Sequence, residues 1–300
     1  MEEERLTLLA PALLLLATLS VTFLIYLGMC AVGKPPELGK IKHNQFFGFF
    51  MARYLIWVIS PFEKMLLGRV SPNAITALSL AMCGAAGVSV AFGQLGLGVW
   101  LFTMAGILDI VDGRLARRLN RTTESGALFD SVSDRWGELF AFVGYAWYLR
   151  DSIWLLAVMG AMGGSMMVSY TRARAEGLKV ELSGGLMQRA ERIFVIVSGT
   201  LLAAWFTLGD SPTAVVDGTA ILGCTMALVA VASTGTAISR WIMAYRVLAK
   251  RDAIKYGTLA PAAPVVIEEP AVVAKPEPVR TPEIFAPVPK ALRESAELPL

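Results

Sequence analysis

Long uninterrupted apolar runs are the feature that most constrains this chain. Residues 7–32 contain no charged side chain, and several later runs also reach the roughly 18 apolar residues that a helix needs to cross a hydrocarbon core. The chain as a whole is 55% hydrophobic and 17% charged, which is too apolar for a soluble domain whose surface must be wetted. The sequence therefore predicts an all-α polytopic membrane protein.

Eight helices are expected. The first, at 7–32, is too long for a signal-peptide core and follows an acidic flank, so it is interpreted as a retained transmembrane helix. The aromatic-rich stretch 45–67, interrupted by three charged residues, is typical of an amphipathic helix that lies in the membrane interface. Six further transmembrane helices are predicted, at about 73–92, 96–118, 126–149, 152–171, 189–207 and 214–246.

The composition changes near residue 257, where the chain becomes rich in Pro, Ala, Val and Glu without a helical period. Proline fixes φ and removes an amide donor, so a disordered tail is predicted there. The expected domain organisation is an added transmembrane helix at 1–33, an interfacial segment at 34–70, a six-helix domain at 71–250 and a Pro/Ala-rich cytoplasmic tail at 257–300.

The positions of Lys and Arg predict the orientation. They collect after the 96–118 helix, between the 152–171 and 189–207 helices, and after the last helix, whereas the alternate links are short and poor in cations. By the positive-inside rule, the three basic regions lie on the cytoplasmic side of the inner membrane, and the acidic N-terminus lies on the opposite side. The net charge is only +3, and no nucleic-acid partner is expected.

Four aspartates form the most informative cluster. Asp109 and Asp112 lie near the end of one predicted helix, and Asp130 and Asp134 lie near the start of the next. Spacings of three and four place each pair on one helical face, and the short link between the helices lets the faces meet. Four crowded carboxylates at a membrane interface repel one another unless divalent cations lie between them. Oxygen ligands favour Mg²⁺ or Mn²⁺ over zinc; the alternative is a solvated helix end paired with arginines.

Small residues are interleaved with these acids. Gly113, Ala116 and Gly126 share the aspartate-bearing faces, and they remove side-chain bulk where a nucleotide must approach the backbone. Arg117 supplies a cation for phosphate.

The eight residues together read Asp-x2-Asp-Gly-x2-Ala-Arg-x8-Gly-x3-Asp-x3-Asp, from Asp109 to Asp134. This run resembles the signature of the CDP-alcohol phosphatidyltransferases at every fixed position. The predicted six-helix core is similar to that family's fold, and Pro72-Asn73 with Thr76 resembles the element that opens its first core helix.

The resemblance implies that an acceptor hydroxyl attacks the lipid-linked phosphorus of CDP-diacylglycerol and releases CMP. It implies that two ions, Mg²⁺ or Mn²⁺, are held by Asp109, Asp112, Asp130 and Asp134, and that Asp134 is also the general base. The residues implied to bind CDP are Asp109, Asp112, Gly113, Ala116, Arg117 and Gly126. A homodimer among membrane lipids is expected from the same resemblance.

The segment 169–192 bears on the acceptor, because it resembles the phosphatidylinositol-phosphate synthase and archaetidylinositol-phosphate synthase branch. That branch uses inositol phosphate, and its acceptor-phosphate residues correspond to Ser169, Arg172, Arg174 and Arg192, with Arg240 added by its helix. The usual branch form has Lys near Arg172 and Pro near Ala190, so glycerol-3-phosphate stays an alternative acceptor. A hypothesis from another class is a cation transporter or scaffold, although these acids cluster at one membrane face instead of crossing it.

Overall fold

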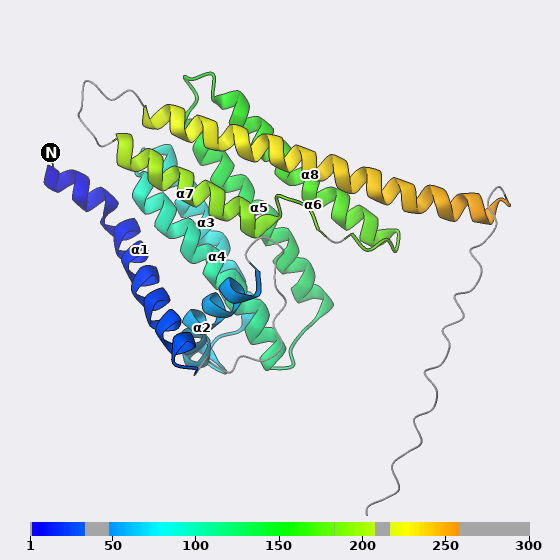
Figure 1. Cartoon of the computed structure of the whole chain (residues 1–300), viewed down its shortest axis with the longest axis horizontal. Coiled ribbons are helices and arrows are strands. Elements are labelled where there is room, and N and C mark those ends of the chain that lie inside the picture. The colour runs from blue at the N-terminus through cyan, green and yellow to red at the C-terminus, as the bar shows by residue number, and fades with distance from the viewer. Residues whose placement is uncertain (1, 34–47, 183, 208–216, 258–300) are drawn as a thin grey trace, which may run out of the picture. The chain divides into compact units, whose positions relative to one another are not determined.

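The computed structural model describes residues 2–33, 48–182, 184–207 and 217–257, and every regular element in those ranges is a helix. The helices are α1 (Glu2–Ala31), α2 (Gly48–Leu66), α3 (Pro72–Ala91), α4 (Leu95–Arg118), α5 (Glu124–Tyr148), α6 (Leu155–Gly177), α7 (Arg189–Thr207) and α8 (Gly218–Lys255) (Figure 1). The chain divides into two units, 1–252 and 253–300, and the described part of the second unit contains only the end of α8 and the two residues after it. The predicted all-α fold is confirmed.

The helix ends differ from prediction mainly at α6 and α8. Both continue past the predicted ends at 171 and 246, to Gly177 and Lys255. The added turns carry arginines and lysines, which form good helices in water but end an apolar run. The predicted tail lies outside the described residues apart from Gly257, as does part of the predicted interfacial segment, at 34–47.

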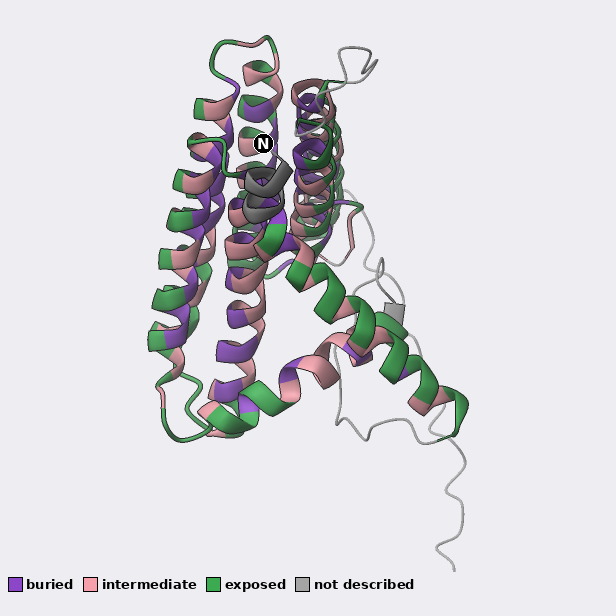
Figure 2. Ribbon diagram, turned by 90° about the vertical axis from the view of Figure 1, so that its left-hand side faces the viewer, coloured by how far each residue is buried: buried purple, intermediate pink, exposed green. Residues whose placement is uncertain are grey.

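Five helices, α1, α3, α4, α7 and α8, contain stretches long and apolar enough to cross a membrane. Large apolar side chains also lie on the outside of the bundle, such as Leu14 (69% exposed) and Val231 (74%), while the buried residues face inward (Figure 2). A water-soluble surface does not carry such patches, whereas lipid is a suitable solvent for them. The protein is an integral membrane protein. The six-span count of the core stays a prediction, because α5 carries five charged residues and α6 is rich in glycine.

The centre of the bundle depends on a close crossing of α3 and α5. A Cβ atom added at Gly144 would lie 2.2 Å from the carbonyl oxygen of Gly87, and one at Gly87 would lie 2.3 Å from that of Phe140. Only glycine allows the two backbones to approach this closely. The crossing brings the start of α3 beside the start of α5, where the candidate site lies.

Helices α1 and α2 are attached to this core from one side. The hydroxyl of Tyr54 on α2 donates to the carbonyl of Leu19 on α1 at 2.6 Å. Glu63, near the end of α2, is fully buried, and its carboxylate lies 2.9 Å from Arg114 Nε and 2.7 Å from Arg118 Nε on α4. Helix α2 is therefore fastened to the helix that carries Asp109 and Asp112.

Candidate active site

Three carboxylates meet between α4 and α5. One carboxylate oxygen from each of Asp109, Asp112 and Asp130 lies within 4.8 Å of the other two. The link 119–123 makes this possible with a tight reversal, in which Asn120 adopts φ 51°, a conformation that asparagine tolerates better than most residues. An all-oxygen set of this kind suits a hard divalent cation, so the residues fit the predicted metal.

Asp112 is held by a residue of α3. It is 3% exposed, and the hydroxyl of Thr76 donates to its Oδ2 at 2.5 Å. The same Thr76 hydroxyl also lies 3.2 Å from the carbonyl oxygen of Pro72. The Pro72-Asn73-x2-Thr76 element thus orients one carboxylate of the cluster. The helix begins there because the side chain of Ser71 caps it and Pro72 occupies its first turn.

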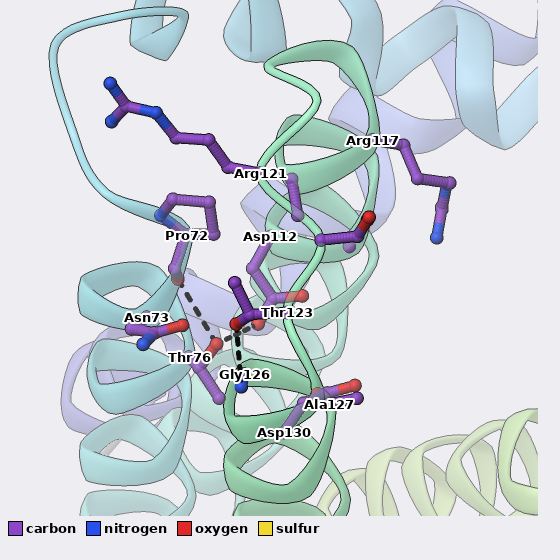
Figure 3. Close-up of a pocket in the computed structure, with 13 residues that line it drawn as sticks. Pro72, Asn73, Thr76, Asp112, Arg117, Arg121, Thr123, Gly126, Ala127 and Asp130 are labelled. Atoms are coloured by element: carbon purple, nitrogen blue, oxygen red, sulfur yellow. Dashed lines mark hydrogen bonds between the residues drawn. The ribbon is translucent and has the colours of Figure 1, made fainter.

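A cavity of about 160 Å³ lies beside this cluster, between the start of α3, the end of α4 and the start of α5 (Figure 3). Five of the six residues predicted to bind CDP line it, namely Asp112, Gly113, Ala116, Arg117 and Gly126. Asp109 is not among its lining residues. The cavity is also lined by Asn73, Arg121, Thr122 and Thr123, which sequence reasoning did not assign to CDP.

Neighbouring side chains leave little space for a Cβ atom at Gly113 and Gly126 in the cavity. The hydroxyl of Thr123 caps α5 by accepting from the amide of Gly126 at 3.0 Å, and a Cβ at Gly126 would lie 2.9 Å from that hydroxyl. A Cβ at Gly113 would lie 3.4 Å from Nη1 of Arg117, because the Arg117 side chain folds back over it.

Asp134 forms an ion pair with Arg189, which was not among the residues predicted to bind the acceptor phosphate. Nη1 of Arg189, the first residue of α7, lies 2.6 Å from Oδ1 of Asp134 and 2.7 Å from Oδ2 of Asp109. One guanidinium therefore bridges a carboxylate of α5 and a carboxylate of α4. Arg189 is 80 residues from Asp109 in sequence, so helical spacing gave no signal for this pair.

Glu138 extends the row of acids on α5 by one turn beyond Asp134. It is buried, accepts from Nη2 of Arg192 at 2.6 Å and lies 3.7 Å from Nε of Arg189. Its spacing of four from Asp134 was a signal available in the sequence. Arg192, predicted to bind the acceptor phosphate, is buried and also donates to the carbonyl of Met187 at 3.2 Å.

The other predicted acceptor residues differ in burial and in their contacts. Arg240 is buried and donates to the carbonyls of Gly184 (2.8 Å) and Val168 (3.2 Å), so it ties the link between α6 and α7 to α8. Arg172 and Arg174 are exposed, and Arg172 pairs with Glu176 at 2.8 Å. The hydroxyl of Ser169 donates to the carbonyl of Ser165 at 3.3 Å. Their role toward an acceptor stays a prediction.

Fold and site together define an integral-membrane enzyme with a carboxylate cluster and a neighbouring cavity at the end of a helical bundle. The family model described as CDP-alcohol phosphatidyltransferase matches residues 69–235, more than half of the chain, and the chain belongs to this family. The predicted family and enzyme class are confirmed. Membership decides against the transporter or scaffold hypothesis.

Two named relatives illustrate the similarity. A phosphatidylinositol phosphate synthase of Streptomyces avermitilis is 34% identical over 225 residues, which cover 73% of this chain and 88% of the relative. An archaetidylinositol phosphate synthase of Methanothermobacter thermautotrophicus is 36% identical over 155 residues, covering 50% and 78%.

Solved structures of similar fold come from Mycobacterium tuberculosis. Its phosphatidylinositol phosphate synthase with CDP-DAG bound is similar with a TM-score of 0.54 and 27% identity, over 63% of this chain and 94% of that one. The same enzyme in complex with manganese and citrate gives a TM-score of 0.55 and 26% identity, over 62% and 88%.

Proposed function

We propose that this protein transfers the phosphatidyl group of CDP-diacylglycerol to a hydroxyl of inositol phosphate and releases CMP. The observation that carries the proposal is the cavity lined by Asp112, Gly113, Ala116, Arg117 and Gly126, which adjoins the three meeting carboxylates. The names of the relatives and the CDP-DAG-bound neighbour support the donor and the acceptor.

We propose that Asp109, Asp112, Asp130 and Asp134 hold two divalent cations, Mg²⁺ or Mn²⁺. The meeting of the first three carboxylates and the manganese complex of the similar structure support a metal site. When bound, such cations neutralise the charge that develops on a pyrophosphate leaving group.

The side chains of the chain itself have separate tasks in this proposal. Arg117 lines the cavity and lies over Gly113, and its guanidinium would pair with a phosphate of the donor. Asp134 is partly exposed on the neighbouring turn of α5 and would take the proton of the acceptor hydroxyl. Ser169, Arg172, Arg174, Arg192 and Arg240 are proposed to form the surroundings of the acceptor phosphate.

Two wider proposals follow from the charge pattern and from the family. The site lies on the cytoplasmic side of the inner membrane, because the links rich in Lys and Arg lie on the same membrane face as the carboxylates. The protein acts as a homodimer, as expected from the resemblance to its family.

The decisive assay gives purified protein labelled CDP-diacylglycerol with inositol phosphate, glycerol-3-phosphate or free inositol, and measures CMP release. We expect release with inositol phosphate, and we expect chelation of divalent cations to stop it. Release with glycerol-3-phosphate alone would make the inositol assignment wrong.

The proposed base is tested by Asp134→Asn, which should lower turnover by about 100- to 10,000-fold, the usual contribution of a positioned base. Asp151→Asn is the matched control, because Asp151 has an exposed side chain in the link between α5 and α6 and should leave turnover unchanged. Full turnover in Asp134→Asn would exclude Asp134 as the base.

A further inference from the structure

Arg189 contacts the carboxylate of Asp134, the proposed base that would take the proton of the acceptor hydroxyl. Its Nη1 contacts Asp134 at 2.6 Å and Asp109 at 2.7 Å, and its side chain is 24% exposed, so the group is reachable from the site. While this bridge stands, Oδ1 of Asp134 and Oδ2 of Asp109 face a guanidinium instead of a hydroxyl or a metal ion.

The contacts of Arg189 are of a kind that an anion can exchange. Arg240 donates to main-chain carbonyls, which are neutral groups fixed in the fold, whereas Arg192 donates both to such a carbonyl and to the buried carboxylate of Glu138. The polar contacts observed for Arg189 in the described residues are to Asp109, Asp134 and Glu138, all carboxylates. Its Nε is buried without a hydrogen-bond partner among those residues, so the guanidinium has a donor to spare.

Arg189 is one of several arginines that lie near one another between α6, α7 and α8. Arg240 is close enough to Arg172 and Arg192 for their charges to act on it, and Arg192 shares Glu138 with Arg189. The backbone between α6 and α7 turns there through Gly184 and Gly185, both with positive φ, before α7 begins at Arg189. Arginine binds phosphate through two parallel hydrogen bonds, which a polyol hydroxyl cannot accept with comparable strength.

We propose that Arg189 is a latch on Asp134 that the phosphate group of the acceptor opens. The phosphate takes the guanidinium, and the two carboxylates are then free for the cations and for the acceptor hydroxyl. A polyol without phosphate leaves the latch closed. This inference rests on the proposed function and gives a reason for a phosphorylated acceptor.

The latch predicts a coupling between phosphate and metal that requires no turnover. Because phosphate withdraws a cation from Asp109 and Asp134, it raises the affinity of these carboxylates for a divalent cation, and the metal raises the affinity for phosphate by the same factor. Couplings between sites in proteins are commonly about 5- to 150-fold.

The test titrates Mn²⁺ into detergent-solubilised wild-type protein without CDP-diacylglycerol, following free Mn²⁺ by electron paramagnetic resonance. Inositol phosphate should tighten Mn²⁺ binding by about tenfold, within the usual range of coupling, and free inositol should not. In Arg189→Gln, Mn²⁺ should bind tightly from the start, and inositol phosphate should add nothing.

Arg135→Gln is the matched control. Arg135 also lies beside Asp134, at 3.9 Å, but it does not bridge to Asp109. This variant should keep the full coupling, and loss of coupling in Arg135→Gln to the same degree would reduce the effect to general charge and overturn the latch. Arg189→Lys is a second variant that keeps the positive charge but lacks the guanidinium that bridges Asp109 and Asp134. It should show a weakened coupling between inositol phosphate and Mn²⁺.

The outcomes separate the latch from the proposed function. Wild-type protein that releases CMP with inositol phosphate but shows no coupling would overturn the latch alone. Coupling that survives in Arg189→Gln would do the same. Intact coupling in a protein that releases CMP only with glycerol-3-phosphate would overturn the inositol assignment and leave the latch standing.

Discussion

Thr76 shows how much of the site depends on one hydroxyl. Its Oγ1 donates at 2.5 Å to Asp112, whose carboxylate is buried and shares a 4.8 Å cluster with Asp109 and Asp130. Hydrogen bonds to charged groups are worth about 1.5–3 kcal/mol. Without this donor, Asp112 would lose the contact that fixes its orientation toward a cation.

We therefore expect Thr76→Val to weaken Mn²⁺ binding by about 10- to 100-fold, the usual effect of removing the partner of a metal ligand. Thr76→Ser keeps the hydroxyl and should bind Mn²⁺ like the wild type. Equilibrium titration of both variants checks the prediction. Equal affinities for Thr76→Val and Thr76→Ser would contradict it.

At the residue scale, the sequence predicts side chains that share a helix better than those that meet across helices. Asp109 and Asp112, like Asp130 and Asp134, are placed by spacings of three and four, and the cluster of the first three forms as expected. Arg189 meets Asp109 across 80 residues, and Arg192 meets Glu138 across 54. Such partners depend on how α4, α5 and α7 pack, which local periodicity does not contain.

At the element scale, α2 is coupled to α4, which lines the cavity, through one buried carboxylate and two arginines. The fully buried carboxylate of Glu63 lies between Arg114 and Arg118, and Arg117, one residue before Arg118, lines the cavity. The end of α4 therefore presents Arg114 and Arg118 to α2 and Arg117 to the cavity. We expect a change in how α2 packs to alter the position of Arg117.

Replacing Glu63 by Gln would leave two arginines facing a neutral group. We expect a loss of about 2 kcal/mol, discounted from the value for a fully buried pair because Arg118 is 41% exposed. Thermal unfolding should occur at lower temperature, and CMP should bind more weakly while inositol phosphate binding is unchanged.

Glu176→Gln is the control for this change, because Glu176 pairs with Arg172 on the exposed surface of α6. Exposed pairs of this spacing are worth only about 0.3–0.5 kcal/mol. If both variants shifted the unfolding temperature equally, Glu63 would have no special role in seating α2.

The lengths of the elements were predictable where lipid determines them. The ends of α3, α4 and α7 lie within a residue of the predicted ones. Hydropathy reports the part of a helix that is solvated by lipid, whereas the hydrogen-bonded helix continues into water wherever the residues permit it. For this reason the charged ends of α6 and α8 extend past their predicted limits.

At the scale of the whole molecule, large apolar side chains lie on the outside of the bundle. The carboxylate cluster, Arg189 and the Glu63 triad all lie near the ends of helices. Their cationic links predict a cytoplasmic site.

Labelling of single cysteines tests this orientation. In a variant lacking Cys30, Cys83 and Cys224, Gln94→Cys, in the link between α3 and α4, should react with an impermeant maleimide in intact cells. Glu124→Cys, at the start of α5, should react only after the inner membrane is opened. The reverse pattern would place the site outside the cytoplasm.

The contact between Gly87 and Gly144 also acts as the fulcrum of a lever. At 1.5 Å per residue, Thr76 lies about 16 Å along α3 from this contact, so a 5° change in the crossing angle would displace it by about 1.4 Å. Displacements of about 1 Å in a reacting site can reduce rate by about 100-fold. The displacement caused by a methyl group at Gly87 or Gly144 would therefore be larger at Thr76 than at the contact itself. These two glycines thus limit how precisely the residues of the site are positioned.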